Sequence, residues 1–517
     1  MADNSMLIAN ALEKTGPQLF NRVDGSRSWR YHLQKKGSSV AMYRRYEAGN
    51  HDSSLTEQMR KMLRIKSDTP LGEFSLNYCR IVIDKMVSRL RVAEIRTDVG
   101  DSSTFISDLL NFQDWESLQI ALFRNATRDG ECYVIPSPTT GKWELEPAYD
   151  GFGGMVAIRT RGSDFPVWAC KVWSEAGLST DPAGEDDDAK GIGKAIMHLT
   201  VYQPNSITHW VGEEGGSEVA PFKFSDSEAT TTYGITSANK SAWMGKVPVV
   251  QFTNLTDNYS VEGESELRVV LPIQNVLNRT LHSLVMASEF GAFKVAYSIG
   301  MELDKSGITP GAILNLVITD DKGVPVTSLS ESQIEFLKAV KVGELEATDL
   351  SQYINLVQDL TRHVSQVSQT PIYGVTFEGA LSGDALRQLE IGLIGKVRRF
   401  QKENTAAVRA LIELSVEIQN FFMTERGEAP GDMGNVTVVW DSPELTDVNA
   451  SISTLIKLRK EAPGLFSDEL LRSRIGSLLG MSQDDIARET VNTANEAQSR
   501  LDRIVNQAGQ GNTDLVQ

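Results

Sequence analysis

The chain has 517 residues, of which 41% are hydrophobic, so it can bury a large core as one large subunit or as two to three ordinary domains. Its formal charge of −17, from 51 Lys and Arg against 68 Asp and Glu, argues against tight DNA binding, which needs a basic surface. The sequence has no run of about 20 apolar residues and no signal-peptide pattern at residues 1–5, which predicts a soluble cytoplasmic protein without a membrane partner.

The first half of the chain passes from helices to strands. Residues 1–60 are polar and mixed, and no role can be read from them. Helical spacing of apolar residues predicts one helix over 76–90 and a second over 105–128, which ends at the turn pair Asp129-Gly130. Short strands separated by Gly, Pro and Asp clusters follow, which predicts an antiparallel sheet region with long loops. These strands are expected at 132–136, 155–158, 167–172, 195–202, 207–211 and 247–252.

Long helices dominate the second half. One follows Gly263, a small mixed unit comes next, and another helix ends at Thr370-Pro371, because the residue before a proline leaves the helical region. After a loop, the longest helix is expected over 384–424, a length on the order of 60 Å. The mixed unit should hold strands at 295–299 and 313–318 and a short helix at 330–340. The tail should hold a strand at 436–440 and helices at 448–459, 468–479 and 483–505.

No pattern predicts a catalytic, metal or cofactor site. Gly191-Ile192-Gly193-Lys194 lacks the first glycine and the Ser or Thr of a phosphate-binding loop. His198 and His209 could face each other across a hairpin, but the six histidines lack metal-ligand spacing. The cysteines are too few and scattered for a disulfide framework, and we expect them to be small buried hydrophobic residues. They are Cys79, Cys132 and Cys170.

Several motifs in a fixed order resemble the portal proteins of tailed double-stranded-DNA bacteriophages, over about residues 60–500. The most specific is Ser-Gly-Asp-Ala-Leu-Arg at 382–387, which follows the Ser-Gln-Thr-Pro break at 368–371. Others are Asn-Tyr-Cys-Arg-Ile-Val-Ile-Asp at 77–84, the helix and Tyr-Val strand at 122–134, Gly-Glu-Ser-Glu-Leu at 263–267 and the tail pieces at 480–482 and 487–489.

The resemblance implies an α+β portal fold with wing, stem, clip and crown parts. Residues 1–60 stay without a role. The implied parts are the wing at 61–262 (helices, then antiparallel strands), the first stem helix at 263–292, the clip at 293–345, the second stem helix at 347–369, the tunnel loop at 370–383, the long wing helix and strand at 384–440, and crown helices with a disordered tail at 441–517.

The resemblance also implies a structural role and no enzyme activity. Portal proteins form rings of twelve copies at one capsid vertex, through which DNA is packaged and later ejected. The implied partners are the terminase motor, which holds the ATPase, the major capsid and scaffolding proteins, a head–tail adaptor, and double-stranded DNA read without sequence specificity. An acidic chain suits this passage, since each Lys or Arg contact would hold the duplex still. The chain would act in the virion after assembly in the host cytoplasm.

Three sets of residues are candidates for contacts with partners. Loop residues expected to face DNA are Tyr373, Thr376, Glu378 and Ser382. A basic cluster expected to touch DNA phosphates or, more commonly on a long helix, to form a solvated or intersubunit ion-pair face is Lys396, Arg398, Arg399 and Lys402. Clip residues expected to face the motor and adaptor are Asp304, Lys305, Asp320, Asp321 and Lys322.

Two other functions remain open from the sequence. The chain could be a different head–tail connector component, such as an adaptor, although adaptors are usually much shorter. It could also be a cytosolic nucleic-acid enzyme whose site has no recognisable pattern. Hydrolysis of nucleotide or cleavage of DNA by the purified protein would favour the enzyme, and ring-shaped particles would favour the portal.

Overall fold

The computed structural model of the chain comprises two units, Met1–Pro443 and Glu444–Gln517. The residues that it describes are 8, 29–52, 75–98, 102–137, 141–160, 162–175, 196–204, 206–217, 220–224, 230–232, 245–256, 262–292, 296–299, 330–332, 334–335, 341–344, 350–372, 383–425, 434–444, 448–461, 471 and 475–476. Within these residues the fold is α+β, with eight helices and thirteen strands, and all pairings between the strands are antiparallel. This confirms the expected fold class.

The first described helix, α2 (Trp29–Glu47), is fixed to its unit by ion pairs as well as by apolar contacts. Arg44 lies 2.9 Å from the carboxylate of Asp129, and Lys36 lies 2.5 Å from that of Glu131. Both carboxylates are almost completely buried, and a buried charge without a partner would be strongly destabilising. Part of the N-terminal segment therefore has a structural role that its sequence did not reveal.

The second helical run of the sequence is two helices, so the prediction of a single helix there is wrong. They are α5 (Ser102–Phe112) and α6 (Trp115–Asp129). Between them Asp114 adopts a left-handed backbone conformation with φ of 52°, which an α-helix cannot continue. Trp115 then packs edge-on against Trp143 with ring centroids 5.7 Å apart. Apolar spacing alone could not reveal this break, because both helices bury residues with the same period.

Two glycines from separate sequence motifs touch each other. A Cβ atom on Gly263 would lie 1.8 Å from the carbonyl oxygen of Gly130, so no side chain fits there. Gly130 also has φ of 93° and ends α6 as its C-cap, a position that favours glycine. A third motif, at 77–84, begins α4 (Tyr78–Val87). The Asn77 side chain is its N-cap and accepts a hydrogen bond from the backbone N–H of Arg80 at 3.1 Å.

The strands form four sheets in the described residues. One sheet has the order β10 (Val250–Thr253), β2 (Glu131–Pro136), β3 (Trp143–Pro147). The largest has the order β4 (Gly154–Ile158), β5 (Trp168–Glu175), β6 (Ile196–Gln203), β7 (Ser206–Ser217), β8 (Ala220–Phe224), with β9 (Thr230–Thr232) also paired to β7. The remaining pairs are β1 (Val92–Thr97) with β13 (Val436–Trp440), and β11 (Ala296–Ile299) with β12 (Lys341–Glu344). The antiparallel strand region expected after residue 131 is confirmed.

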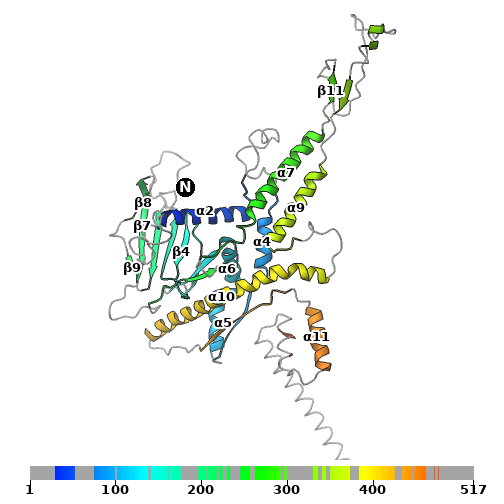
Figure 1. The fold of residues 1–517 in the computed structure, drawn as a ribbon. Helices are drawn as coiled ribbons and strands as arrows, with labels where there is room; N and C mark the ends of the chain where they lie inside the picture. The colour runs from blue at the N-terminus through cyan, green and yellow to red at the C-terminus, as the bar shows by residue number, and fades with distance from the viewer. Residues whose placement is uncertain are drawn as a thin grey trace, which may run out of the picture. The chain divides into compact units, whose positions relative to one another are not determined.

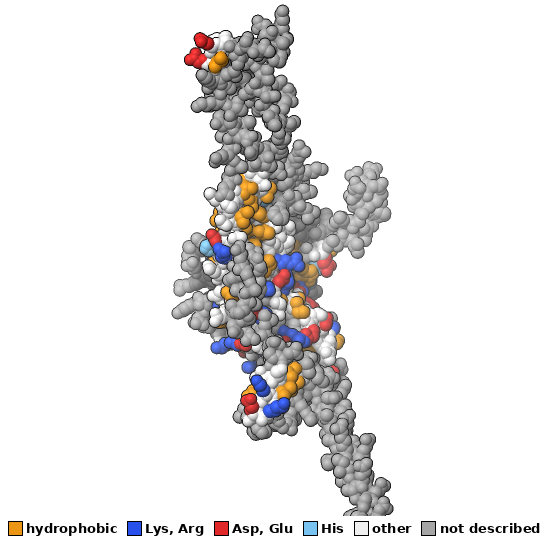
Figure 2. Space-filling model, turned by 90° about the vertical axis from the view of Figure 1, so that its right-hand side faces the viewer, with side chains coloured by type: hydrophobic (Ala, Val, Ile, Leu, Met, Phe, Trp, Pro, Cys, Tyr) orange, Lys and Arg blue, Asp and Glu red, His pale blue; other side chains and the backbone are white. Residues whose placement is uncertain are grey.

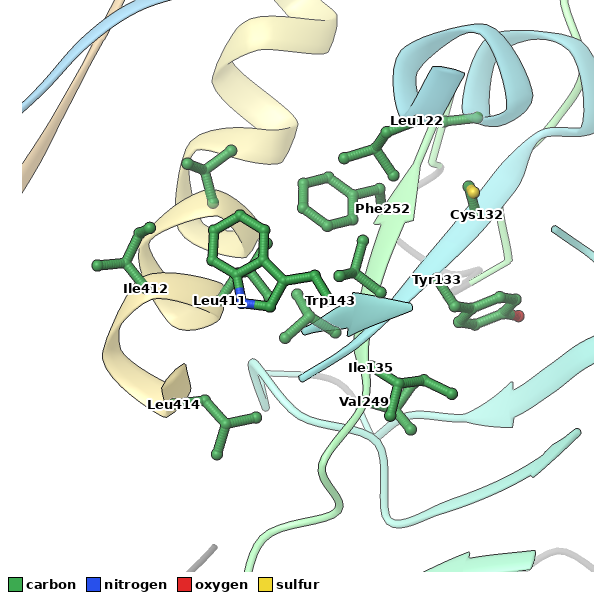
Figure 3. Close-up of a cluster of buried hydrophobic side chains, with 14 of the residues drawn as sticks. Leu122, Cys132, Tyr133, Ile135, Trp143, Val249, Phe252, Leu411, Ile412 and Leu414 are labelled. Atoms are coloured by element: carbon green, nitrogen blue, oxygen red, sulfur yellow. The ribbon is translucent and has the colours of Figure 1, made fainter. Parts of the chain in front are cut away.

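The long helix α10 (Gly383–Glu425) packs its apolar face against the three-stranded sheet. Leu411 and Leu414 of α10 belong to the same buried cluster as Trp143 and Phe252 of the sheet (Figure 3). The indole N–H of Trp143 donates to the hydroxyl of Ser415 at 2.8 Å, so its polar atom is also satisfied. With 43 residues the helix is about 65 Å long, which confirms the prediction of an unusually long helix.

The helices α7 (Leu271–Ala292) and α9 (Ser351–Val367) lie side by side (Figure 1). Strand β11 follows α7 and strand β12 precedes α9, so the paired strands connect the two helices through the predicted mixed unit. The strand expected at 313–318 lies outside the described residues. In the second unit, α11 (Val448–Glu461) confirms one predicted helix.

Two expectations from composition can be compared with the described residues. None of the described helices has the length and hydrophobicity of a membrane span. The cysteines are free and buried, as expected, and burial raises the pKa of Cys79 to about 12.

Candidate functional site

The end of α9, where the predicted tunnel loop begins, is a hydrogen-bonded turn. Gln369 follows the helix with φ of 50°, in the left-handed region. The backbone N–H of Thr370 donates to the carbonyl of Ser365 at 3.1 Å, and the Ser365 hydroxyl donates to the carbonyl of Thr370 at 2.8 Å. This is the bonding of a helix C-cap in which the left-handed residue is usually glycine. A glutamine in that position indicates that the surroundings hold the turn in place.

Lys396, in the first third of α10, reaches this turn. Its ammonium group donates to the carbonyl of Ser368 at 2.7 Å and lies 2.5 Å from a carboxylate oxygen of Glu266. Both charged side chains are only 5% exposed. The two charges compensate each other in an interior where either one alone would be strongly destabilising.

Glu266 is held in place by further hydrogen bonds. Its backbone N–H donates to the carbonyl of Thr127 at 3.1 Å, and its second carboxylate oxygen accepts from the side-chain amide of Asn254 at 3.2 Å. The preceding residue Ser265 donates its hydroxyl to the carbonyl of Arg128. The motif at 263–267 therefore joins the end of α6 to the segment before α7, and the ion pair adds α10 and the end of α9.

Gly392 allows α10 to approach the turn closely. A Cβ atom at this position would lie 3.1 Å from the Cβ of Gln369 and 3.4 Å from its carbonyl oxygen. Gly392 and Lys396 are four residues apart, so they share one face of α10. Beside them the Ser368 hydroxyl is buried without a hydrogen-bond partner, which costs about 1–3 kcal/mol. We call this set the loop-base cluster: Glu266, Ser365, Ser368, Gln369, Thr370, Gly392 and Lys396.

The four cations predicted to lie together on α10 separate into two groups. Lys396 is internal, whereas Arg398, Arg399 and Lys402 are exposed on the surface of the helix. Burial raises the pKa of Glu403, and the nearby Arg399 acts in the opposite direction. Only the three exposed cations are positioned to meet a partner directly.

The other predicted contact residues lie outside the described residues, and their roles stay predictions. They are Tyr373, Thr376, Glu378 and Ser382 in the loop and Asp304, Lys305, Asp320, Asp321 and Lys322 in the clip.

Exposed apolar side chains gather on α7 and α9. Ile354 and Leu356 of α9 are 48% and 46% exposed, and Val276 of α7 is 50% exposed. Figure 2 shows hydrophobic side chains collected over α7 and α9 on the face that it draws. The apolar positions of α9 cover an arc of about 160° at about 100° per residue, yet only Thr361 and Val364 within α9 are buried. The described part of one subunit therefore leaves much of this face uncovered.

His198 and His209 face each other across β6 and β7, as the sequence suggested they could. Nδ1 of His198 lies 3.2 Å from Nε2 of His209, and the ring of Trp173 stacks on His198 with centroids 4.9 Å apart. The Thr200 hydroxyl lies 2.8 Å from Nδ1 of His209. Burial lowers the pKa of His209, and His198 lowers it further. No cluster of three His, Cys, Asp or Glu residues suited to a metal ion occurs in the parts of the chain that the structure describes.

The pairing of Lys396 with Glu266 was missed from the sequence. One signal was present, because Lys396 shares the helix face of Leu393, Val397 and Phe400, all of them buried. A lysine on an apolar face predicts a buried charge that needs a partner. Periodicity could not identify the partner, since Glu266 belongs to a distant part of the chain.

The chain is similar to known proteins of one family and to two solved structures. The family model of the SPP1 Gp6-like phage portal proteins matches residues 29–496. No curated protein matches the chain. One similar solved structure is the virion of the native gene transfer agent (GTA) particle, at 11% identity and a TM-score of 0.37, covering 85% of this chain and 99% of that chain. Another is the neck of the native GTA particle computed with C12 symmetry, at 11% identity and a TM-score of 0.38, covering 77% of this chain and 88% of that chain.

The family match spans most of the sequence, so the fold and its motifs define a structural subunit of a head–tail connector rather than an enzyme. The chain belongs to the SPP1 Gp6-like phage portal proteins. The resemblance seen in the sequence motifs is confirmed.

Proposed function

We propose that the chain forms a ring of twelve copies at one vertex of the capsid and that DNA enters and leaves the head through its central channel. The observation that supports this most directly is the uncovered apolar face of α9. Side chains such as Ile354 and Leu356 are about half exposed on a helix that also packs against α7.

A closed ring gives each subunit two neighbours and so covers two different surfaces of the stem. Burial of apolar side chains stabilises by about 25 cal/mol for each Å² removed from water. Because each interface is repeated around the ring, a modest gain at one contact is multiplied by the number of copies. The exposed apolar face is thus explained by neighbouring copies of the same chain.

The parts of the subunit are assigned to the ring by their order along the chain. The stem helices line the passage, and the loop 370–383 projects into it, with Tyr373, Thr376, Glu378 and Ser382 facing DNA. The loop-base cluster supports this proposal, because it fixes the first end of the loop to α10 and to the start of α7 through Lys396 and Glu266.

The remaining parts meet the protein partners. The clip at 293–345 docks the terminase motor and later the head–tail adaptor, and the wing and crown meet capsid and scaffolding proteins. The exposed cations Arg398, Arg399 and Lys402 contact either DNA phosphates or acidic side chains of a neighbouring subunit, and the ion-pair surface is the favoured assignment on a chain with a net charge of −17.

A deletion test distinguishes this function from other roles in the particle. In the phage or prophage that encodes the chain, we expect loss of the gene to leave heads without DNA and without tails, and a plasmid copy to restore both. Nuclease-protected DNA per head, measured by quantitative PCR, is the readout. Heads that fill with DNA to the normal amount without this protein would contradict the proposal.

A further inference from the structure

The loop-base cluster contains a buried lysine whose presence is not explained by stability alone. Lys396 lies on the apolar face of α10, where an apolar side chain would also be buried. Replacement of a buried ion pair by apolar residues of similar volume is often neutral or stabilising. What apolar residues cannot supply is the hydrogen bond from the ammonium group to the carbonyl of Ser368 at 2.7 Å.

The turn that receives this hydrogen bond is held from outside. Gln369 occupies a left-handed position where glycine is favoured, and the Ser368 hydroxyl is buried without a partner. Gly392 and Lys396 contact the turn from one face of α10, and Glu266 forms an ion pair with the Lys396 ammonium. The position of the backbone where it leaves α9 is therefore determined by α10 and by the segment before α7.

We propose that Lys396 is a positioning residue for the tunnel loop: its hydrogen bond to Ser368, aimed by Glu266, fixes the first end of the loop relative to α10. This inference rests on the proposed function, since it concerns how the loop is held where DNA passes. Lys396 does not contact DNA, because it is buried within its own subunit. Its effect on packaging is transmitted through the turn.

The first test separates positioning from stability. In the double variant Lys396→Met with Glu266→Met, both charges are removed together and the volume is nearly kept. We expect these rings to assemble and to melt within a few degrees of the wild type, while nuclease-protected DNA per head falls at least tenfold. A map of the variant ring by cryo-electron microscopy should show residues 368–372 displaced relative to α10.

A second variant restores the ion pair without the hydrogen bond. The exchange Lys396→Glu with Glu266→Lys keeps opposite charges together, but a carboxylate at 396 cannot donate to the Ser368 carbonyl. We expect the melting temperature of these rings to lie closer to the wild-type value than their nuclease-protected DNA per head does. The matched control is Gln388→Met, which places a methionine at an exposed polar position of the same helix and should package like the wild type.

Each outcome bears on the proposal. Packaging equal to wild type in either double variant, with normal ring formation, would overturn it. Failure of both double variants to form rings would assign the pair to stability alone and would also overturn it. If wild-type rings do not support packaging at all, the proposed function fails instead, so the two failures are distinguishable.

Discussion

The ammonium group of Lys396 lies 2.5 Å from a carboxylate oxygen of Glu266, and each side chain is 5% exposed. This contact joins the first third of the longest helix to the segment that leads into α7. Because the same ammonium group donates to Ser368, three parts of the chain that are distant in sequence meet at one lysine.

The variant Lys396→Met should be much less stable than the wild type. It leaves the Glu266 carboxylate buried without its cation, which costs about 3–5 kcal/mol. The double variant Lys396→Met with Glu266→Met should recover most of this loss, because no buried charge remains. Chemical denaturation followed by tryptophan fluorescence measures both. Equal losses in the single and double variants would show that the ion pair is not the cause.

Gly392→Ala should also destabilise the protein, through crowding. The new methyl group would lie 3.1 Å from the Cβ of Gln369, and forcing an extra carbon into a packed site costs about 1–3 kcal/mol. Gly395→Ala is the matched control, since nothing lies within 4 Å of its Cβ position. It should be stabilising by about 0.5–1 kcal/mol, because alanine is the better helix former. Thermal midpoints of the two variants should therefore move in opposite directions.

The stability of the six-stranded sheet should fall in mild acid because of His209. Its pKa is lowered in the folded state by burial and by His198, so the folded protein binds this proton less readily than the unfolded chain. Such a group contributes stability that is complete above the ordinary histidine pKa of about 6.5 and is lost as the pH falls through the lowered pKa. We expect the thermal midpoint to drop between about pH 7 and pH 5.

The variant His209→Gln is the control for this pH effect. Glu175, which lies 3.6 Å from Nε2 of His198, and Lys171, whose ammonium lies 4.9 Å from the centre of the Trp173 ring, are the charged groups beside the stack. Both are retained in the variant, so a smaller drop in its thermal midpoint can be assigned to His209. An identical pH dependence in the two proteins would contradict the assignment.

An acidic residue on the apolar face of α9 should weaken the ring. Leu356→Asp places a charge where a neighbouring copy should bury a leucine, and an unpaired buried charge is strongly unfavourable. We expect the protein concentration needed for half-maximal assembly to rise at least tenfold in analytical ultracentrifugation. Asn355→Asp introduces the same charge at an exposed polar position on the side of α9 away from its apolar arc and should have little effect. Equal assembly of the two variants would exclude this face from the interface.

Elements whose residues follow one period with clear ends could be predicted from the sequence. The strand Val436–Trp440 and the helix Gly383–Glu425 were expected within one residue of their observed bounds. Local conformation and distant pairing could not be predicted. The left-handed Asp114 divides a run of uniform helical spacing, and β1, which was not expected, pairs with β13 from the other end of its unit.

The candidate site shows the same limit. The break at Thr370-Pro371 marked the end of the second stem helix, and α9 does end nearby, at Val367. The sequence could not reveal that Lys396 is buried while Arg398, Arg399 and Lys402 are exposed. Burial of Lys396 depends on its pairing with Glu266 and on the close approach of α10 at Gly392. Such contacts are set by tertiary packing, which carries no period in the sequence.

The mass and symmetry of the purified protein test the central claim most directly. Native mass spectrometry, with class averages from electron microscopy of the same sample, should give particles of twelve times 56.9 kDa, about 680 kDa, with an open centre. A single species that remains a monomer or dimer over a wide range of salt and protein concentration would contradict the account.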